Sequence, residues 1–151
     1  MIKIGIFREV VLKIYNIQAY QNQTFKARPP KVAEEIVDLK VFYHHIYEYK
    51  KGIRNLILTT ENSKYKDTIE QRLKTENIDY LIHDVAPNKI NVYFGAKQCV
   101  EVIKTFNPKL NEITAEQDFI LGILLGYDRV RQCERYMKIK NNEIKVGKKS
   151  L

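Results

Sequence analysis

The chain has 151 residues, 29% of them charged, and a net charge of +8. This length and composition predict one soluble globular domain with its own hydrophobic core. No segment approaches the roughly 18 apolar residues that span a bilayer, which excludes a membrane-spanning protein. The only cysteines, Cys99 and Cys133, are far apart and no signal peptide precedes them, so we expect a reducing cytoplasm and no disulfide scaffold.

The positive charge is concentrated at the two ends of the chain. Residues 1–40 hold seven Lys/Arg against four Asp/Glu, and residues 138–151 hold five Lys against one Glu. Residues 41–137 are almost neutral, with fourteen Lys/Arg and thirteen Asp/Glu. This distribution favours solubilising ends and argues against nucleic-acid binding, because no basic face or known reader motif is present.

The N-terminal region, residues 1–39, is predicted to be an extension. Its apolar residues recur at helical spacing, as Ile4, Phe7, Val11 and Ile14. A short strand over residues 2–6 is the alternative. Pro29–Pro30 cannot continue a helix, so we expect a linker and a boundary near Leu39. Residues 40–137 then form one domain, and residues 138–151 form a basic tail that is frayed after Lys140.

Residues 41–51 are predicted to be a helix. The cations Lys50 and Lys51 precede Gly52 and an apolar residue, the usual pattern of a helix C-terminus. A strand with alternating tyrosines is the alternative. Residues 55–60 and 80–85 are predicted strands, joined by a helix whose inner face is Tyr65, Ile69 and Leu73 and whose cap is Asn62 or Ser63. Strand, helix and strand in this order predict a right-handed parallel crossover.

Residues 90–94 alternate between apolar and polar side chains and are predicted to return as an antiparallel strand with one face on the core. An apolar stripe then predicts a helix that ends at Asn107–Pro108; its members are Ala96, Cys99, Val100, Ile103 and Phe106. Thr114 and Gln117 match a capping box, which opens one long final helix running to Met137. The expected fold is α+β, in the order α-β-α-β-β-α-α, with a small mixed three-stranded sheet and about five helices.

The first half of the final helix is apolar on most sides, so we expect it to be buried on most sides. Gly122 and Gly126 are four residues apart, which indicates that a neighbouring backbone approaches closely. Two uses stay open: packing on the sheet, or the seam of a symmetric dimer. The predicted seam residues are Phe119, Gly122, Ile123 and Gly126.

The second half of this helix is polar and supplies the predicted binding residues, which are Tyr127, Asp128, Arg129, Arg131, Gln132, Glu134 and Arg135. One interpretation is a solvated face with ion pairs Asp128–Arg131 and Arg131–Glu134. The other is a recognition surface, because the planar guanidinium groups can bind carboxylate or phosphate with two hydrogen bonds.

His44, His45 and Glu48 form the other group of potential ligands. His44 and Glu48 share a helix face, and His83 or Asp84 could complete a metal site if it folded against them. Structural or surface histidines are the favoured interpretation. Cys133 has no nearby general base in the sequence. We therefore predict no catalytic residues, no cofactor and no metal ligands, and we keep a weak metal-binding or enzymatic role of His44, His45 and Glu48 as an alternative.

Three separated segments resemble one bacterial family, the domain of unknown function numbered two thousand and twenty-three. They are Tyr43-His44-His45-Ile46-Tyr47-Glu48-Tyr49-Lys50-Lys51-Gly52-Ile53-Arg54, Asn91-Val92-Tyr93-Phe94-Gly95 and residues 118–136. The resemblance covers residues 40–137 and implies a small homodimer with three strands and five helices. Residues 1–39 are then an added element or an upstream start. The resemblance implies no activity and no catalytic residues.

The favoured function is therefore an uncharacterised homodimeric interaction module in the cytoplasm, without a catalytic site. Genes of similar proteins can lie beside flavodoxin genes. Together with the basic ends and the arginines of the last helix, this implies an alternative in which the chain docks on an acidic electron carrier such as flavodoxin.

Overall fold

The computed structural model describes residues 31–147 and the side chains of residues 33–142. The chain divides into two compact units, Met1–Lys40 and Val41–Leu151. In the first unit, helix α2 spans Lys31–Asp38, a stretch for which the sequence had suggested no element. The predicted N-terminal helix and the Pro29–Pro30 linker lie outside the described residues.

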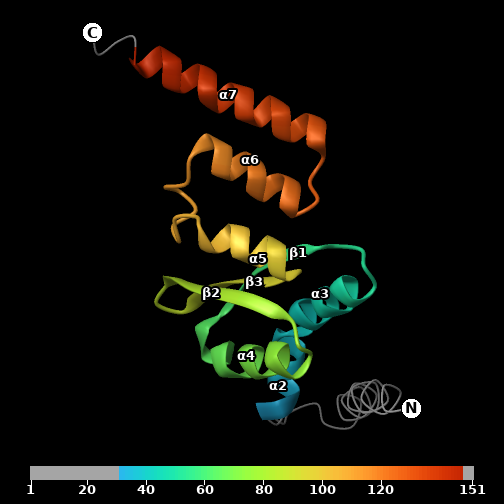
Figure 1. Cartoon of the computed structure of the whole chain (residues 1–151). Helices are drawn as coiled ribbons and strands as arrows, with labels where there is room; N and C mark the ends of the chain where they lie inside the picture. The colour runs from blue at the N-terminus through green and yellow to red at the C-terminus, as the bar shows by residue number, and fades with distance from the viewer. Residues whose placement is uncertain (1–30, 148–151) are drawn as a thin grey trace, which may run out of the picture. The chain divides into compact units, whose positions relative to one another are not determined.

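The second unit holds a three-stranded sheet with helices on both faces (Figure 1). Its elements in chain order are α3 (Lys40–Lys50), β1 (Leu56–Asn62), the short 3-10 helix η1 (Ser63–Tyr65), α4 (Lys66–Thr75), β2 (Asp79–Ala86), β3 (Lys89–Gly95), α5 (Lys97–Lys104), α6 (Ala115–Leu124) and α7 (Arg129–Gly147). The predicted α+β class is confirmed. The expected fraying after Lys140 is wrong, because α7 continues to Gly147.

The sheet has the order β1-β3-β2, and both neighbouring pairs are antiparallel. β1 and β2 therefore run parallel to each other, as the crossover predicted, but β3 lies between them. The prediction of a mixed sheet is wrong for this reason: the two parallel strands share no hydrogen bonds. β3 is the central strand and is buried along its length from Ile90 to Gly95. The prediction that only one face of this strand meets the core is therefore wrong, because helices cover both faces of the sheet.

The end of α3 confirms the sequence signal at Gly52. This residue has φ +71°, the left-handed conformation that glycine adopts without strain. The Gly52 amide donates to the Tyr49 carbonyl at 2.9 Å, and the Ile53 amide donates to the Glu48 carbonyl at 3.0 Å. These two bonds form a Schellman motif, which satisfies carbonyls that the helix end would leave unpaired.

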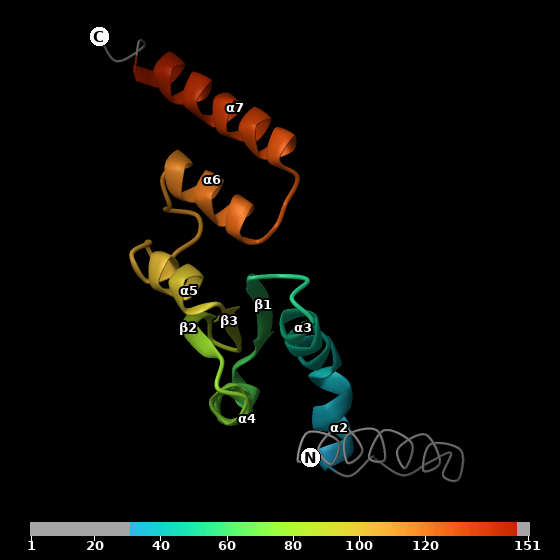
Figure 2. The same ribbon diagram turned by 45° about the vertical axis from the view of Figure 1, so that its right-hand side comes forward.

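Each face of the sheet has its own core, because side chains alternate along a strand. One core joins the sheet to α5 and α6; its buried members are Leu56, Tyr93, Val100, Ile103, Leu121 and Leu125. On the opposite face, Phe94 meets Phe42 of α3 edge to face, with ring centroids 5.6 Å apart. There too the Tyr80 hydroxyl donates to Glu70 of α4 at 3.4 Å. α3 and α4 thus cover one face, and α5 covers the other, followed by α6 and α7 (Figure 2).

Two local devices orient α5 and α6. At Gly95 an added Cβ would lie 2.3 Å from the Asn55 carbonyl oxygen, so only glycine lets β3 turn into α5 beside that backbone. At α6 the predicted capping box is confirmed. The Gln117 amide donates to the Thr114 hydroxyl at 3.2 Å, and the Thr114 amide donates to the Gln117 side chain at 3.1 Å. α6 is thereby fixed on the core and carries α7 on its outer side.

Candidate functional site

The predicted single final helix is wrong: α6 and α7 form a helical hairpin. Gly126 has φ +79° and ends α6. The Gly126 amide donates to the Ile123 carbonyl at 3.0 Å and the Tyr127 amide donates to the Gly122 carbonyl at 3.0 Å, a second Schellman motif. Asp128 then caps α7, accepting from the Arg131 amide at 2.9 Å. A helix stop and a helix start thus follow each other directly.

The two helices approach most closely at Gly122. A Cβ on this residue would lie 2.1 Å from Oε1 and 2.5 Å from Cδ of Gln132, a residue of α7. Glycine therefore leaves room for the Gln132 side chain where α7 crosses α6, and a larger residue would force that side chain to move. The prediction that a neighbouring backbone approaches the glycines closely is wrong, because the atoms against Gly122 belong to the Gln132 side chain. Gly126, however, serves the turn and has open space around its missing side chain.

Polar contacts fasten α7 along α6. Arg135 donates through Nε and a terminal nitrogen to both carboxylate oxygens of Asp118, at 2.6 and 3.0 Å. This hydrogen bonding raises the pKa of the Arg135 guanidinium. Near the start of α6, Glu116 accepts from the Tyr136 hydroxyl at 3.2 Å and pairs with Lys140 at 2.7 Å. The hydrogen bond from Lys140 lowers the pKa of Glu116 to about 2.

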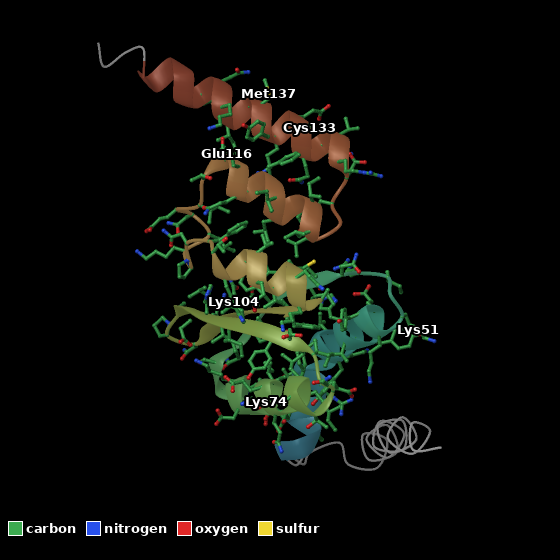
Figure 3. The ribbon with its side chains drawn as sticks, viewed as in Figure 1. Lys51, Lys74, Lys104, Glu116, Cys133 and Met137 are labelled. Atoms are coloured by element: carbon green, nitrogen blue, oxygen red, sulfur yellow. The ribbon has the colours of Figure 1, made fainter. Side chains whose placement is uncertain are left out.

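An apolar groove of about 440 Å³ lies along this hairpin; its lining residues are Glu116, Phe119, Ile120, Cys133, Tyr136 and Met137. The rings of Phe119 and Tyr136 are 5.6 Å apart. Ile120 is 40% exposed and Met137 is 53% exposed. Figure 3 shows Cys133 and Met137 on α7 and Glu116 at the beginning of α6. The groove is open to solvent and consists almost wholly of apolar side chains, as binding surfaces for apolar partners do.

A second cluster surrounds Glu48 on α3. His45 Nδ1 lies 2.8 Å from one carboxylate oxygen of Glu48, His44 Nε2 lies 3.7 Å from the other, and Arg54 Nε lies 3.9 Å away. The hydrogen bond with His45, supported by the charge of Arg54, lowers the pKa of Glu48. Burial raises the pKa of Glu61, whose carboxylate accepts from the Thr59 hydroxyl at 2.7 Å.

The idea that His83 or Asp84 completes a metal site with this cluster is wrong. His83 pairs with Asn91 on the sheet face that carries Tyr93, whereas α3 packs on the opposite face. Asp84 pairs instead with Lys66 at 3.2 Å. Within residues 33–142, no three His, Cys, Asp or Glu side chains are grouped so that they could hold a metal ion. His45 is hydrogen-bonded to Glu48, and an enzymatic role of His44, His45 and Glu48 stays an alternative.

A family model described as a protein of unknown function, DUF2023, matches residues 40–139. The chain belongs to the DUF2023 family. The matched region begins at the first residue of α3 and includes the sheet, α6 and the part of α7 up to residue 139. No curated protein matches the chain.

The structure of the DUF2023 domain divides the predicted binding residues into two groups. Three of them act within the hairpin: Asp128 caps α7, Gln132 covers Gly122, and Arg135 pairs with Asp118. The other four are exposed, namely Tyr127, Arg129, Arg131 and Glu134. The predicted ion pairs of Arg131 with Asp128 and Glu134 do not form. The predicted division of this stretch into an apolar and a polar half coincides with the turn at Gly126.

The predicted dimer seam is also divided by the hairpin. Phe119 lines the groove and Ile123 is half-buried, but Gly122 is covered by Gln132 and Gly126 lies in the turn. Packing of Gly122 within the chain is therefore observed, although against α7 and not against the sheet. A dimer seam stays a prediction for the remaining residues.

Sequence reasoning missed the groove residues Ile120, Tyr136 and Met137 in the DUF2023 domain as site candidates. Their signal was available: Val130, Cys133 and Met137 recur at spacings of three and four on α7. Cys133 is exposed and Cys99 packs against the core, and both thiols are free. None of the described helices is both long and apolar enough to cross a membrane.

Proposed function

We propose that this DUF2023 protein is a bacterial, cytoplasmic homodimer that works as an interaction module, and that the two copies associate through the α6–α7 groove. The observation that carries the proposal is the open apolar groove between two helices that are otherwise joined by specific contacts. Free thiols, one of them exposed, support a reducing compartment.

The groove has the properties of an unfilled helix interface. Its exposed members Ile120 and Met137 come from different helices, so one partner helix can bury both. Complete burial of a large apolar side chain stabilises by about 1.5–3 kcal/mol, and about half of that remains to be gained at each of these half-exposed residues. An apolar surface of this kind on a small domain is typical of a protein–protein contact.

A second copy is the occupant best suited to this surface. Two hairpins that meet around a twofold axis form a four-helix arrangement, a common way to bury apolar helix faces. The hairpin that forms the groove carries both signs of charge, because Glu116 pairs with Lys140 and Asp118 pairs with Arg135. A hairpin of mixed charge avoids the repulsion that two copies of a single-sign surface would meet.

The test is the mass of the purified chain by analytical ultracentrifugation at micromolar concentration. We expect a dimer for the wild type and a monomer for Ile120→Glu and Met137→Glu, because each puts a charge into the buried seam. Val85→Glu is the matched control, since Val85 is 45% exposed on β2 and lies outside the groove. A monomeric wild type, or a dimer that survives both groove variants, contradicts the proposal.

Cys133 reports independently on the surface that the dimer uses. Its thiol lines the groove, so a maleimide should label it slowly in the wild-type dimer and rapidly in the monomeric Ile120→Glu variant. A Cys99→Ser background leaves Cys133 as the only thiol. Equal labelling rates in dimer and monomer would place the interface elsewhere on the chain.

A further inference from the structure

The turn between α6 and α7 presents a second exposed surface, formed by Tyr127, Arg129, Val130 and Arg131 and called here the turn patch. Tyr127 is 56% exposed and Val130 is 67% exposed, the highest value among the large apolar residues of the described chain. None of the four residues lines the groove. The turn patch therefore adjoins the groove without lining it, since Val130 lies three residues before the groove residue Cys133 on α7.

Both arginines of the turn patch lack an acidic partner within the described residues. Arg131 lies three residues before Glu134 on α7 and still forms no ion pair with it. Elsewhere on the hairpin, Arg135 is bound to Asp118 and Lys140 to Glu116, whereas no ion pair is seen for Lys138 within the described residues. The cations that fasten the hairpin are thus paired, and those of the turn patch are left free for a contact outside the chain.

The position of these arginines works against the stability of α7. They occupy its first and third residues, and the first turn contains no acidic side chain. The N-terminus of a helix carries partial positive charge, so cations there are unfavourable and acidic residues are preferred. Neither packing nor helix electrostatics accounts for two arginines at this place, but binding to an acidic partner does.

We propose that the turn patch is a docking surface for an acidic surface of another protein. Arginine forks bind carboxylates with paired hydrogen bonds, and Tyr127 and Val130 supply apolar contact between and beside them. Tyrosine and arginine together are the residues that dominate protein–protein contacts.

The test uses a random copolymer of glutamate and tyrosine as a mimic of an acidic protein surface, with binding to the full-length chain measured at low ionic strength. The variant is Arg129→Glu/Arg131→Glu. The control is Lys97→Glu/Lys138→Glu, which changes the net charge equally at exposed cations outside the turn patch. We expect the variant to lose about tenfold or more in affinity and the control to lose at most about threefold. Tyr127→Ala should also weaken binding.

Folding of the variant is checked by its Tm, which should equal or exceed that of the wild type because glutamate is favourable in the first turn of a helix. Its mass by ultracentrifugation should match that of the wild type. This measurement tests the dimer proposal independently of the copolymer assay, which tests the turn patch. Equal losses in the variant and the control would show attraction by net charge alone and overturn the proposal. Absence of binding to the copolymer at low salt would overturn it as well. Tighter binding of a single-stranded RNA oligonucleotide, lost in the same variant, would assign the turn patch to phosphate instead.

Discussion

Replacing Gly122 by alanine should have opposite effects on stability in two backgrounds. In the wild type we expect the free energy of unfolding to fall by about 1 kcal/mol, because the new methyl group meets Gln132. In a Gln132→Ala background the same replacement should raise it by about 1 kcal/mol, the usual gain of alanine over glycine inside a helix. The change of sign is the prediction.

The magnitude follows from the geometry at the helix crossing. The added Cβ would lie 2.1, 2.5 and 3.1 Å from Oε1, Cδ and Cγ of Gln132. All three atoms belong to a flexible side chain, so Gln132 can rotate away while the backbone stays in place. Overpacking of this kind costs about 1–3 kcal/mol, and a value near 2 is reasonable when only one side chain moves. The helix gain of about 1 kcal/mol offsets half of that cost.

Urea unfolding of the four proteins in the double-mutant cycle measures this coupling, at one fixed protein concentration because association stabilises the folded state. We expect a coupling energy of about 2 kcal/mol between Gly122 and Gln132. If Gly122→Ala changes stability by the same amount in both backgrounds, α7 does not cross α6 at Gly122. The same result would remove the steric argument for glycine at that position.

Three further predictions concern single residues. Gly126→Ala should lower the free energy of unfolding by about 1 kcal/mol in urea melts, because φ is positive there, and Gly126→Asn should lower it less. Glu116 has its pKa lowered from 4.5 to about 2 by Lys140, so its contribution to stability is complete above pH 4.5 and is lost as the pH falls toward about 2. Urea melts of Glu116→Gln across that range should lack this decrease, and an unchanged pH profile would contradict the ion pair. Burial lowers the pKa of His83 from 6.5, so the unfolded chain takes up the proton first and stability should fall as the pH drops below 6.5. His83→Phe keeps the edge-to-face contact with Tyr93 but removes the titrating group. Its Tm should therefore fall less than that of the wild type between about pH 8 and pH 5, and an equal fall in Tm would refute the assignment.

The elements that the sequence predicted well are those with local signals. Gly52 after two lysines ended α3, and the pair Thr114 and Gln117 opened α6. The alternation in residues 90–94 indicated β3. Each of these signals acts through hydrogen bonds or side-chain directions within a few residues, so one stretch of sequence contains all the information.

The break at Gly126 was missed although its signal is local too. Gly122 and Gly126 were interpreted as a pair on one helix face, and the apolar pattern continued across both. Gly126 followed two residues later by Asp128 is a helix stop followed by a helix cap, which predicts two helices. The spacing of the glycines concealed this, because a small-residue pair also predicts close packing.

The sheet order and the groove could not be predicted from local patterns. β3 lies between β1 and β2 because of pairings such as Thr60 with Asn91, which join distant parts of the chain. The groove depends in the same way on residues of α6 and α7 that meet only after the turn has reversed the chain, such as Phe119 and Tyr136. The cluster around Glu48 was predictable, since His44 and His45 precede it by one helical turn.

The central place of β3 also determines when the fold can form during synthesis. β1 and β2 leave the ribosome first, but they share no hydrogen bonds and have no strand to pair with until residues 89–95 follow. β2 and β3 are joined by a tight turn and can pair at once, whereas β1 must close a long loop before it docks. A nascent chain that ends before β3 has two unpaired strands and no sheet, so a truncation before Lys89 should be degraded or aggregate. Loss of α7, in contrast, should leave the sheet folded.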